Sequence, residues 1–159
     1  MGAGAADIAE VVSEVKESLP DLQPPPALEP QQARFRLFDS ITTFLKRASQ
    51  AQPLVLVLDN LHWADRPSLL LLEFLAQELT ETHLLVVGTY RDTELTRQHP
   101  LGHALGELAR EPLFRRVLLR GLSEEDVAQF IDVTAGFSPH QELVSAVHAR
   151  TEGNPLFMT

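Results

Sequence analysis

Residues Leu54 to Asp65 read LVLVLDNLHWAD, and this stretch decides the expected fold. Its first five residues are apolar at every position rather than at alternate positions, which is typical of a strand covered by helices on both faces. Pro53 precedes the strand without removing an interior hydrogen bond. Asp59 follows at the carboxyl end, where open α/β sheets bind their ligands. An acid there can hold a hydrated Mg²⁺, although an ordinary solvated turn aspartate explains the pattern equally well.

The segments after this strand predict an alternation of helices and strands. Asp65 is expected to cap a helix over residues 66–80. Residues 84–87 form a second apolar run, and a helix between two strands of one sheet makes those strands parallel. Residues 117–119 are a third candidate strand. The expected fold class is therefore α/β, with parallel strands sandwiched by helices.

The two ends of the chain are expected to be helical. Residues 6–18 have the apolar spacing of one short amphipathic helix. The prolines of residues 20–30 predict an extended linker, and residues 31–49 carry the broad apolar stripe of a packed helix. Beyond residue 121 the pattern is purely helical, and it begins with Ser123 and Asp126 at the spacing of a capping box.

Composition excludes several classes of function. The 159 residues include 22 acids against 13 lysines and arginines, a formal charge of −9, and no cysteine. The absence of cysteine excludes disulfides, thiolate metal sites and cysteine nucleophiles. The negative balance predicts no direct contact with nucleic acid, because that affinity comes mainly from basic side chains. No apolar run approaches the ~18 residues of a membrane span, and no secretory signal is visible, so we expect a cytoplasmic protein without a membrane partner.

Four landmarks resemble one family of nucleotide-binding proteins. The LVLVLDNLHWAD string is similar to the Walker B element of STAND-type P-loop ATPases, which are found in large bacterial LuxR-type transcription regulators and in cyclase-linked modules. Residues 88–94 (GTYRDTE) resemble the sensor segment of that family. Residues 121–125 (GLSEE) and 151–157 (TEGNPLF) resemble later landmarks, in the same order. The resemblance covers nearly the whole chain and implies a partial P-loop NTPase fold followed by a helical lid subdomain.

The resemblance assigns ATP and Mg²⁺ as cofactors and gives individual residues a role. It implies that Asp59 coordinates Mg²⁺ through water and that Arg91 senses the terminal phosphate, for which a forked guanidinium is suited. A pairing of Arg91 with Asp92 or Glu94 is the structural alternative. Gly153 and Pro155 resemble the Gly-x-Pro element that abuts the adenine, although a helix-breaking cap explains the same residues.

The resemblance places two residues at the catalytic step, Arg91 and Asn60. Asn60 stands where many P-loop ATPases have a glutamate that polarises the attacking water. An amide can orient that water but cannot take its proton, so hydrolysis is expected to be slow. This substitution favours a nucleotide switch over a motor.

The glycine-rich phosphate loop of these ATPases has no counterpart here, since neither Lys16 nor Lys46 follows a glycine. We therefore expect a fragment in three parts: residues 1–30 as N-terminal helix and linker, 31–121 as ATPase core with Walker B and sensor strands, and 122–159 as the start of the helical lid.

The expected function is that of a regulatory ATPase fragment, in a signal-transduction or transcription-regulator protein, with weak or no ATP binding in isolation. Its expected partners are the missing Walker A region and an intramolecular effector domain; nucleotide-dependent self-association and slow turnover in the full-length protein stay open. The alternative is a degenerate α/β protein-interaction module that binds no nucleotide.

Overall fold

The computed structural model describes residues 4–96 and 98–158. The chain divides into two compact units, Met1–Arg115 (unit 1) and Arg116–Thr159 (unit 2). Unit 1 contains the strands and most of the helices, and unit 2 is helical.

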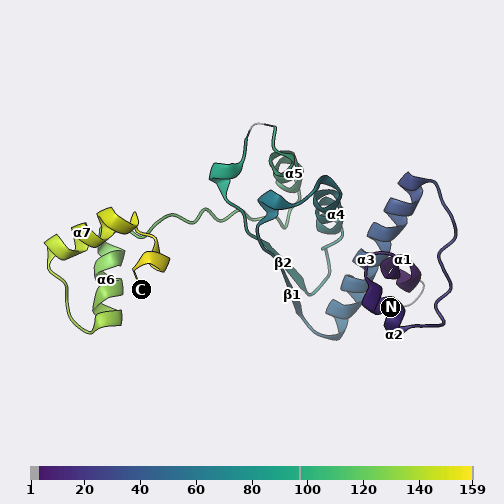
Figure 1. The fold of residues 1–159 in the computed structure, drawn as a ribbon, viewed down its shortest axis with the longest axis horizontal. Helices are drawn as coiled ribbons and strands as arrows, with labels where there is room; N and C mark the ends of the chain where they lie inside the picture. The colour runs from purple at the N-terminus through teal and green to yellow at the C-terminus, as the bar shows by residue number, and fades with distance from the viewer. Residues whose placement is uncertain (1–3, 97, 159) are drawn as a thin grey trace. The chain divides into compact units, whose positions relative to one another are not determined.

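Two parallel strands form the sheet of unit 1. Strand β1 (Leu54–Leu58) pairs with β2 (Leu84–Gly88) in the register Leu54 with Leu84 through Leu58 with Gly88. Helix α4 (Arg66–Gln77) lies between the two strands in sequence (Figure 1). The prediction of a parallel βαβ unit is confirmed, and the parallel direction brings the carboxyl ends of both strands to the same edge of the sheet.

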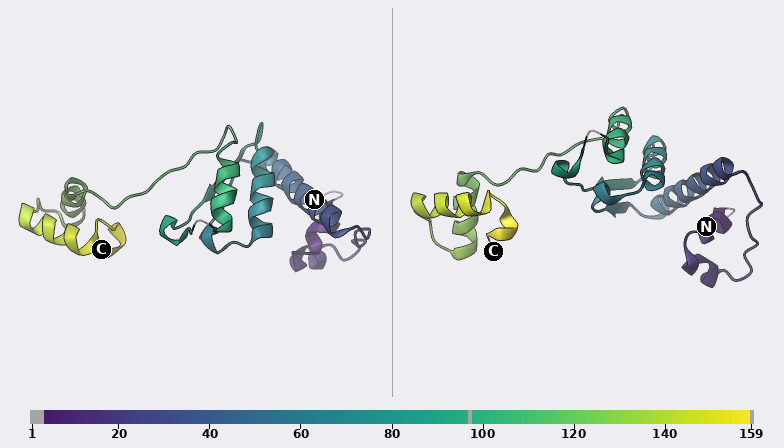
Figure 2. Two further views of the ribbon diagram at one scale, coloured as in Figure 1. Left: turned by 90° about the horizontal axis from the view of Figure 1, so that it is seen from above. Right: turned by 45° about the horizontal axis from the view of Figure 1, so that its top comes forward.

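Helix α4 begins as the sequence predicts. The Asp65 carboxylate accepts a hydrogen bond of 2.9 Å from the backbone N–H of Ser68, and a proline lies in the first turn of the helix. Its apolar side turns inward, with Leu69, Leu72 and Leu75 buried. Helix α5 (Pro100–Leu108) packs beside α4, as both views of Figure 2 show. Leu69 contacts buried residues of α5 in one apolar cluster.

The expectation that helices cover both faces of the sheet is wrong. Side chains alternate between the faces of a strand. Those of one face are inward or half-buried, but four apolar side chains on the other face are exposed by 38 to 64%: Val55, Val57, Leu85 and Val87. The helices of the described chain therefore leave one face open, and an unbroken apolar run does not show whether the second layer is present.

The predicted third strand is also wrong. Residues 117–119 form neither helix nor strand, and all three side chains are exposed. A strand is stable only when a neighbouring strand accepts and donates its backbone hydrogen bonds. Within the part of the chain that the structure describes, the sheet consists of β1 and β2 alone, and no strand pairs with this segment.

The N-terminal segment forms two short helices rather than the single helix predicted over residues 6–18. Helix α1 (Ala5–Ala9) and helix α2 (Ser13–Ser18) are separated by a turn in which Val12 is extended. The break lets Ile8 and Val15 enter one apolar cluster, while Val11, which a continuous stripe would bury, is exposed.

Helix α3 (Pro30–Ala51) contacts the N-terminal segment through a part-buried ion pair. The Asp7 carboxylate accepts hydrogen bonds from Arg36 Nε at 2.7 Å and from Ser40 Oγ at 2.9 Å. Residues 22–29, before α3, form no helix or strand, as their prolines predict.

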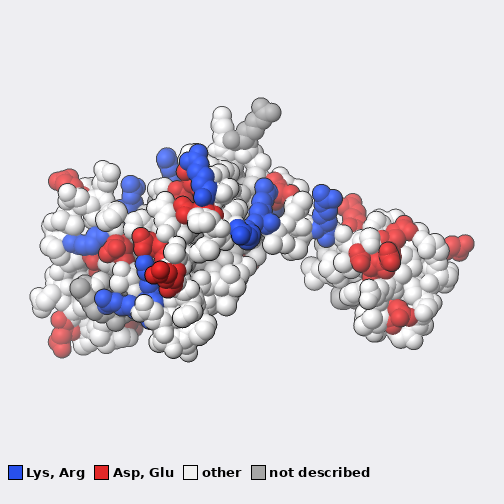
Figure 3. Space-filling view, turned by 180° about the vertical axis from the view of Figure 1, so that it is seen from behind, with Lys and Arg blue, Asp and Glu red and all other residues white. Residues whose placement is uncertain are grey.

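Unit 2 contains helix α6 (Glu124–Ala135), helix α7 (Gln141–Thr151) and the short 3₁₀ turn η4 (Pro155–Phe157). The predicted capping box is confirmed: the Ser123 side chain accepts from the Asp126 N–H, and the Asp126 side chain accepts from the Ser123 N–H. Gly136 ends α6 at a φ of 74°. On the face in Figure 3, acidic and basic side chains are interspersed over unit 1, and acidic ones dominate unit 2.

Candidate functional site

The candidate site lies where β1 and β2 end. The register pairs Leu58 with Gly88, so the next residues, Asp59 and Thr89, emerge side by side. Thr89 Oγ1 donates a hydrogen bond to Asp59 Oδ1. Asn60 Nδ2 donates to the second carboxylate oxygen, Oδ2, at 2.9 Å. Both oxygens of the Asp59 carboxylate are therefore oriented by neighbours.

Backbone hydrogen bonds fix the turn that carries this carboxylate. Thr89 N donates to the carbonyl of Leu58 at 3.0 Å, and Leu61 N donates to the carbonyl of Thr89 at 2.8 Å. Asn60 N donates to Thr89 Oγ1 at 3.1 Å. Asn60 itself has a φ of 57°, in the left-handed region that asparagine enters more readily than most residues. Thr89 thus ties the end of β2 to the turn after β1 through both its backbone and its hydroxyl.

The geometry at Asp59 suits a hydrated divalent cation. A carboxylate offers about four acceptor positions, the two hydrogen bonds occupy two of them, and the Asp59 side chain is exposed. Mg²⁺ usually keeps several water ligands and contacts the protein through one or two carboxylates. No cluster of three or more His, Asp or Glu side chains that could cage a metal occurs among the described residues. The exposed carboxylate therefore keeps acceptor positions that can take hydrogen bonds from water, including metal-bound water.

Arg91 lies on the loop that leaves β2. Its Nη1 is 3.5 Å from Glu94 Oε1, and its side chain is 70% exposed. Of the two partners that the sequence left open, Glu94 is the one the structure pairs with it. Exposed ion pairs contribute only about 0–1 kcal/mol, so a phosphate group could replace Glu94 as the partner of the guanidinium.

His62 connects this loop to the Asp59 turn. Its ring, on the 3₁₀ turn η2 (Leu61–Trp63), accepts a hydrogen bond at Nδ1 from Arg91 N at 3.3 Å. The other ring nitrogen, Nε2, is 3.5 Å from Glu94 Oε2. The side chain is 1% exposed, so the ring is packed inside this turn. Trp63 contacts the His62 ring but is 74% exposed.

Sequence reasoning missed the part played by Thr89. The residue stands in the quoted sensor segment, but its contact with Asp59 follows only from the strand register. Once Leu58 is known to pair with Gly88, the proximity of the two following residues is a geometric consequence. A threonine directly after a second parallel strand is the signal that could have identified it.

The remaining predicted site residues belong to unit 2. Gly153 has a φ of 72°, and Pro155 is the first residue of η4. Asn154 caps this short turn, since its Oδ1 accepts from Leu156 N at 3.0 Å. The structure therefore places Asp59, Asn60 and Arg91 on the two loops that leave the sheet of unit 1, and Gly153 and Pro155 at the end of α7 in unit 2.

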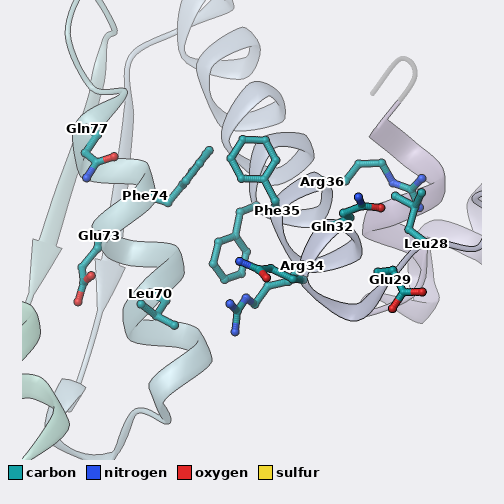
Figure 4. A pocket seen from close by; sticks show the side chains of 12 residues that line it. Leu28, Glu29, Gln32, Arg34, Phe35, Arg36, Leu70, Glu73, Phe74 and Gln77 are labelled. Carbon is teal, nitrogen blue, oxygen red and sulfur yellow. The ribbon is translucent and has the colours of Figure 1, made fainter.

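A groove of about 910 Å³ lies between α3 and α4. Its walls include Phe35, Phe38 and Phe74, and the rings of Phe35 and Phe74 meet edge to face at 5.5 Å (Figure 4). None of the predicted site residues lines it. The groove is a feature of helix packing, separate from the edge of the sheet that carries Asp59.

Together these features define an α/β module with its candidate site at the carboxyl ends of parallel strands. A family model described as AAA ATPase domain matches residues 2–87, more than half of the 159-residue chain. The chain therefore belongs to the AAA ATPase domain family. Asp59 and Asn60 lie inside the matched range, whereas Arg91, Gly153 and Pro155 lie beyond it.

The comparison with curated proteins gives no match, and neither does the comparison with solved structures. A separate property concerns membranes: among the described residues, no helix combines the length and the apolar character that a membrane crossing requires.

Proposed function

We propose that the chain is the segment of a STAND-type P-loop ATPase that runs from the Walker B strand into the helical lid. In this proposal, ATP controls a conformational switch in a signal-transduction or transcription-regulator protein. The observation that carries it is the Asp59 carboxylate, exposed after β1 and held by Thr89 and Asn60, in a chain of the AAA ATPase domain family.

Each site residue has a distinct task in this proposal. Asp59 accepts hydrogen bonds from the water shell of Mg²⁺, an ion that neutralises phosphate charge when it is bound. Asn60, whose amide already contacts Asp59, orients a water molecule but cannot accept its proton. Arg91 exchanges Glu94 for the terminal phosphate. Gly153 and Pro155 form a turn against the adenine. Slow hydrolysis makes the ATP-bound state long-lived, which suits a switch.

The phosphate cradle, in this proposal, comes from a glycine-rich loop encoded outside the 159 residues. Backbone amides and a lysine of such a loop provide most of the contacts to the β and γ phosphates. We therefore expect the isolated chain to bind Mg-ATP weakly or not at all. Equilibrium binding with labelled ATP checks this, and a low-micromolar affinity would contradict it. The genomic sequence upstream should encode Gly-x-x-x-x-Gly-Lys-Ser/Thr within about a hundred residues, roughly one domain length.

The decisive variant is Asp59→Ala in the longer protein that carries the phosphate loop. We expect its response to Mg-ATP to be lost, because the carboxylate that orients the hydrated ion is gone. Asp65→Ala is the matched control: it removes an equal charge six residues away, but that carboxylate caps α4 instead. Equal loss in both variants, or an unchanged response in Asp59→Ala, would count against the proposed function.

The open face of the sheet favours a second candidate, a protein-interaction module that binds no nucleotide. Val55, Val57, Leu85 and Val87 form an exposed apolar surface, and such surfaces often bind other proteins. Under this alternative, Asp59→Ala leaves partner binding unchanged and Mg-ATP has no effect on it. A charged substitution at Val57 would instead abolish the interaction.

A further inference from the structure

Two glycines of unit 2 meet backbone to backbone. A Cβ added to Gly121, before α6, would lie 2.2 Å from the carbonyl oxygen of Glu152. A Cβ added to Gly153, after α7, would lie 2.2 Å from the carbonyl oxygen of Leu122. Leu122 N donates to the carbonyl of Gly153 at 2.8 Å. We call this contact of residues 121–122 with 152–153 the glycine clasp.

The two glycines are required for different reasons. Gly153 has a φ of 72°, so both its backbone conformation and its neighbours exclude a side chain. Gly121 is not among the glycines with positive φ, so its own backbone conformation suits other residues. The obstacle at Gly121 is backbone atoms of the opposite segment, which cannot rotate away as a flexible side chain would. The clasp alone therefore explains a glycine at position 121.

The clasp also fixes the residues that follow it. Asn154 N donates to the carbonyl of Thr151 at 2.9 Å, and Asn154 Oδ1 accepts from Leu156 N at 3.0 Å. A shift of Gly153 would therefore move Asn154 and the start of η4. Gly121 makes none of these contacts itself, but it determines how closely the turn can approach the segment before α6.

We infer that Gly121 is a positioning residue that sets where unit 2 presents Asn154 and Pro155. Any ligand that contacts this turn is then coupled through the clasp to the segment before α6. The inference rests on the proposed function in one respect, namely that this turn contacts the nucleotide base.

The test is Gly121→Ala in the full 159-residue chain, observed through backbone amide resonances by NMR. We expect the amides of Gly153, Asn154 and Leu156 to shift while α6 and α7 remain formed. We also expect a lower melting temperature for unit 2. Without the clasp, Gly121→Ala would instead raise the melting temperature. Alanine in place of glycine at a compatible position stabilises a fold, because it reduces the conformational freedom of the unfolded chain.

Gly136→Ala is the matched control. It lies in the same unit and at a positive φ of 74°, yet an added Cβ meets no atom within 4 Å. It should lower the melting temperature without moving the Asn154 and Leu156 resonances. If Gly121→Ala leaves those resonances in place, or raises the melting temperature, the inference is wrong.

If unit 2 of Gly121→Ala does not fold, the unmodified chain decides. The clasp requires the Leu122 amide to exchange with solvent at least about tenfold more slowly than in an unstructured chain, and requires short proton distances between Gly121 and Gly153. Unprotected exchange at Leu122 would overturn the inference. A separate titration with Mg-ATP tests the nucleotide assignment, so a failure of the clasp and a failure of the proposed function are distinguishable.

Discussion

The turn after β1 and the turn after α7 both contain residues in the left-handed region, but they are held in different ways. Asn60, in the first turn, has a φ of 57°, and Glu152 and Gly153, in the second, have φ values of 51° and 72°. In the first turn, side chains add to the backbone hydrogen bonds, with the Thr89 hydroxyl and the Asn60 amide on Asp59. The second is fixed by backbone against backbone.

The two turns therefore place different requirements on the residues that form them. Side chains that hold a carboxylate can exchange hydrogen bonds with water bound to a cation, so under the proposed function the first turn responds to a ligand. Backbone packing has no such exchangeable partner, so the second turn is a fixed support. Substitutions should accordingly change ligand response in the first turn and folding in the second.

The largest expected effect is the loss of stability in Gly153→Ala. The new Cβ would overlap the Leu122 carbonyl, and the positive φ adds strain, so we expect unit 2 to lose about 3 kcal/mol. Asn154→Ala, which removes only a side-chain cap, should cost about 1 kcal/mol. Urea denaturation followed by the amide signals of α6 and α7 measures both. Equal losses would show that the second turn is held by side chains after all.

The second effect is a gain of turnover in Asn60→Glu, measured in the longer protein with the phosphate loop. A carboxylate can accept the proton of the attacking water, so we expect ATP hydrolysis to rise by about tenfold or more. Asn60→Gln has the same chain length and the same left-handed backbone cost but no basic group, and it should not accelerate hydrolysis. Unchanged turnover in Asn60→Glu, with unchanged ATP affinity, would refute the role given to Asn60.

A third, smaller effect is expected from Thr89→Val. This change keeps the branched shape but removes the hydroxyl that donates to Asp59 and accepts from Asn60 N. We expect unit 1 to lose about 1 kcal/mol, measured by urea denaturation with the fluorescence of Trp63, the single tryptophan of the chain. Thr93→Val, at an exposed position of the 3₁₀ turn η3 (Asp92–Glu94) that follows Thr89, is the control and should be nearly neutral. If both variants behave alike, side chains do not hold the first turn.

The sequence predicts local features of this molecule better than long-range ones. The Asp65 cap and the Ser123–Asp126 capping box are confirmed, since each depends on neighbours within a few residues. The strand at residues 54–58 is also confirmed, because the second apolar run at 84–88 pairs with it. The single helix over 6–18 is wrong because burial against α3 overrides the apolar periodicity. The strand at 117–119 is wrong because a strand also requires a partner.

The candidate site likewise has local features that the sequence predicts and long-range features that it does not. The position of Asp59 after an apolar strand could be predicted from the adjacent residues. Its contact with Thr89 could not, because it depends on the register between segments 30 residues apart. The glycine clasp likewise joins residues 121 and 153, and no local pattern distinguishes Gly121 from an ordinary loop glycine.

The smallest expected effect is a pH dependence that compares the helix caps of the two units. The side-chain and backbone hydrogen bonds of Ser68 lower the pKa of Asp65 below its ordinary value of 3.8, and those of Ser123 do the same to the pKa of Asp126. A carboxyl whose pKa is lower in the folded chain binds more protons when the chain is unfolded. Its contribution to stability is therefore present above pH 3.8 and disappears as the pH falls through the lower folded pKa. Asp126→Asn should therefore weaken unit 2 at pH 6, and this effect should shrink as the pH falls below 3.8. Asp65→Asn should do the same for unit 1 alone. Amide exchange of α6 and the fluorescence of Trp63 follow the two units separately.

The stability difference between Asp126→Asn and the unmodified chain should not grow as the pH falls. A growing difference would have the wrong sign, and would mean that the Asp126 carboxylate is not what holds the first turn of α6.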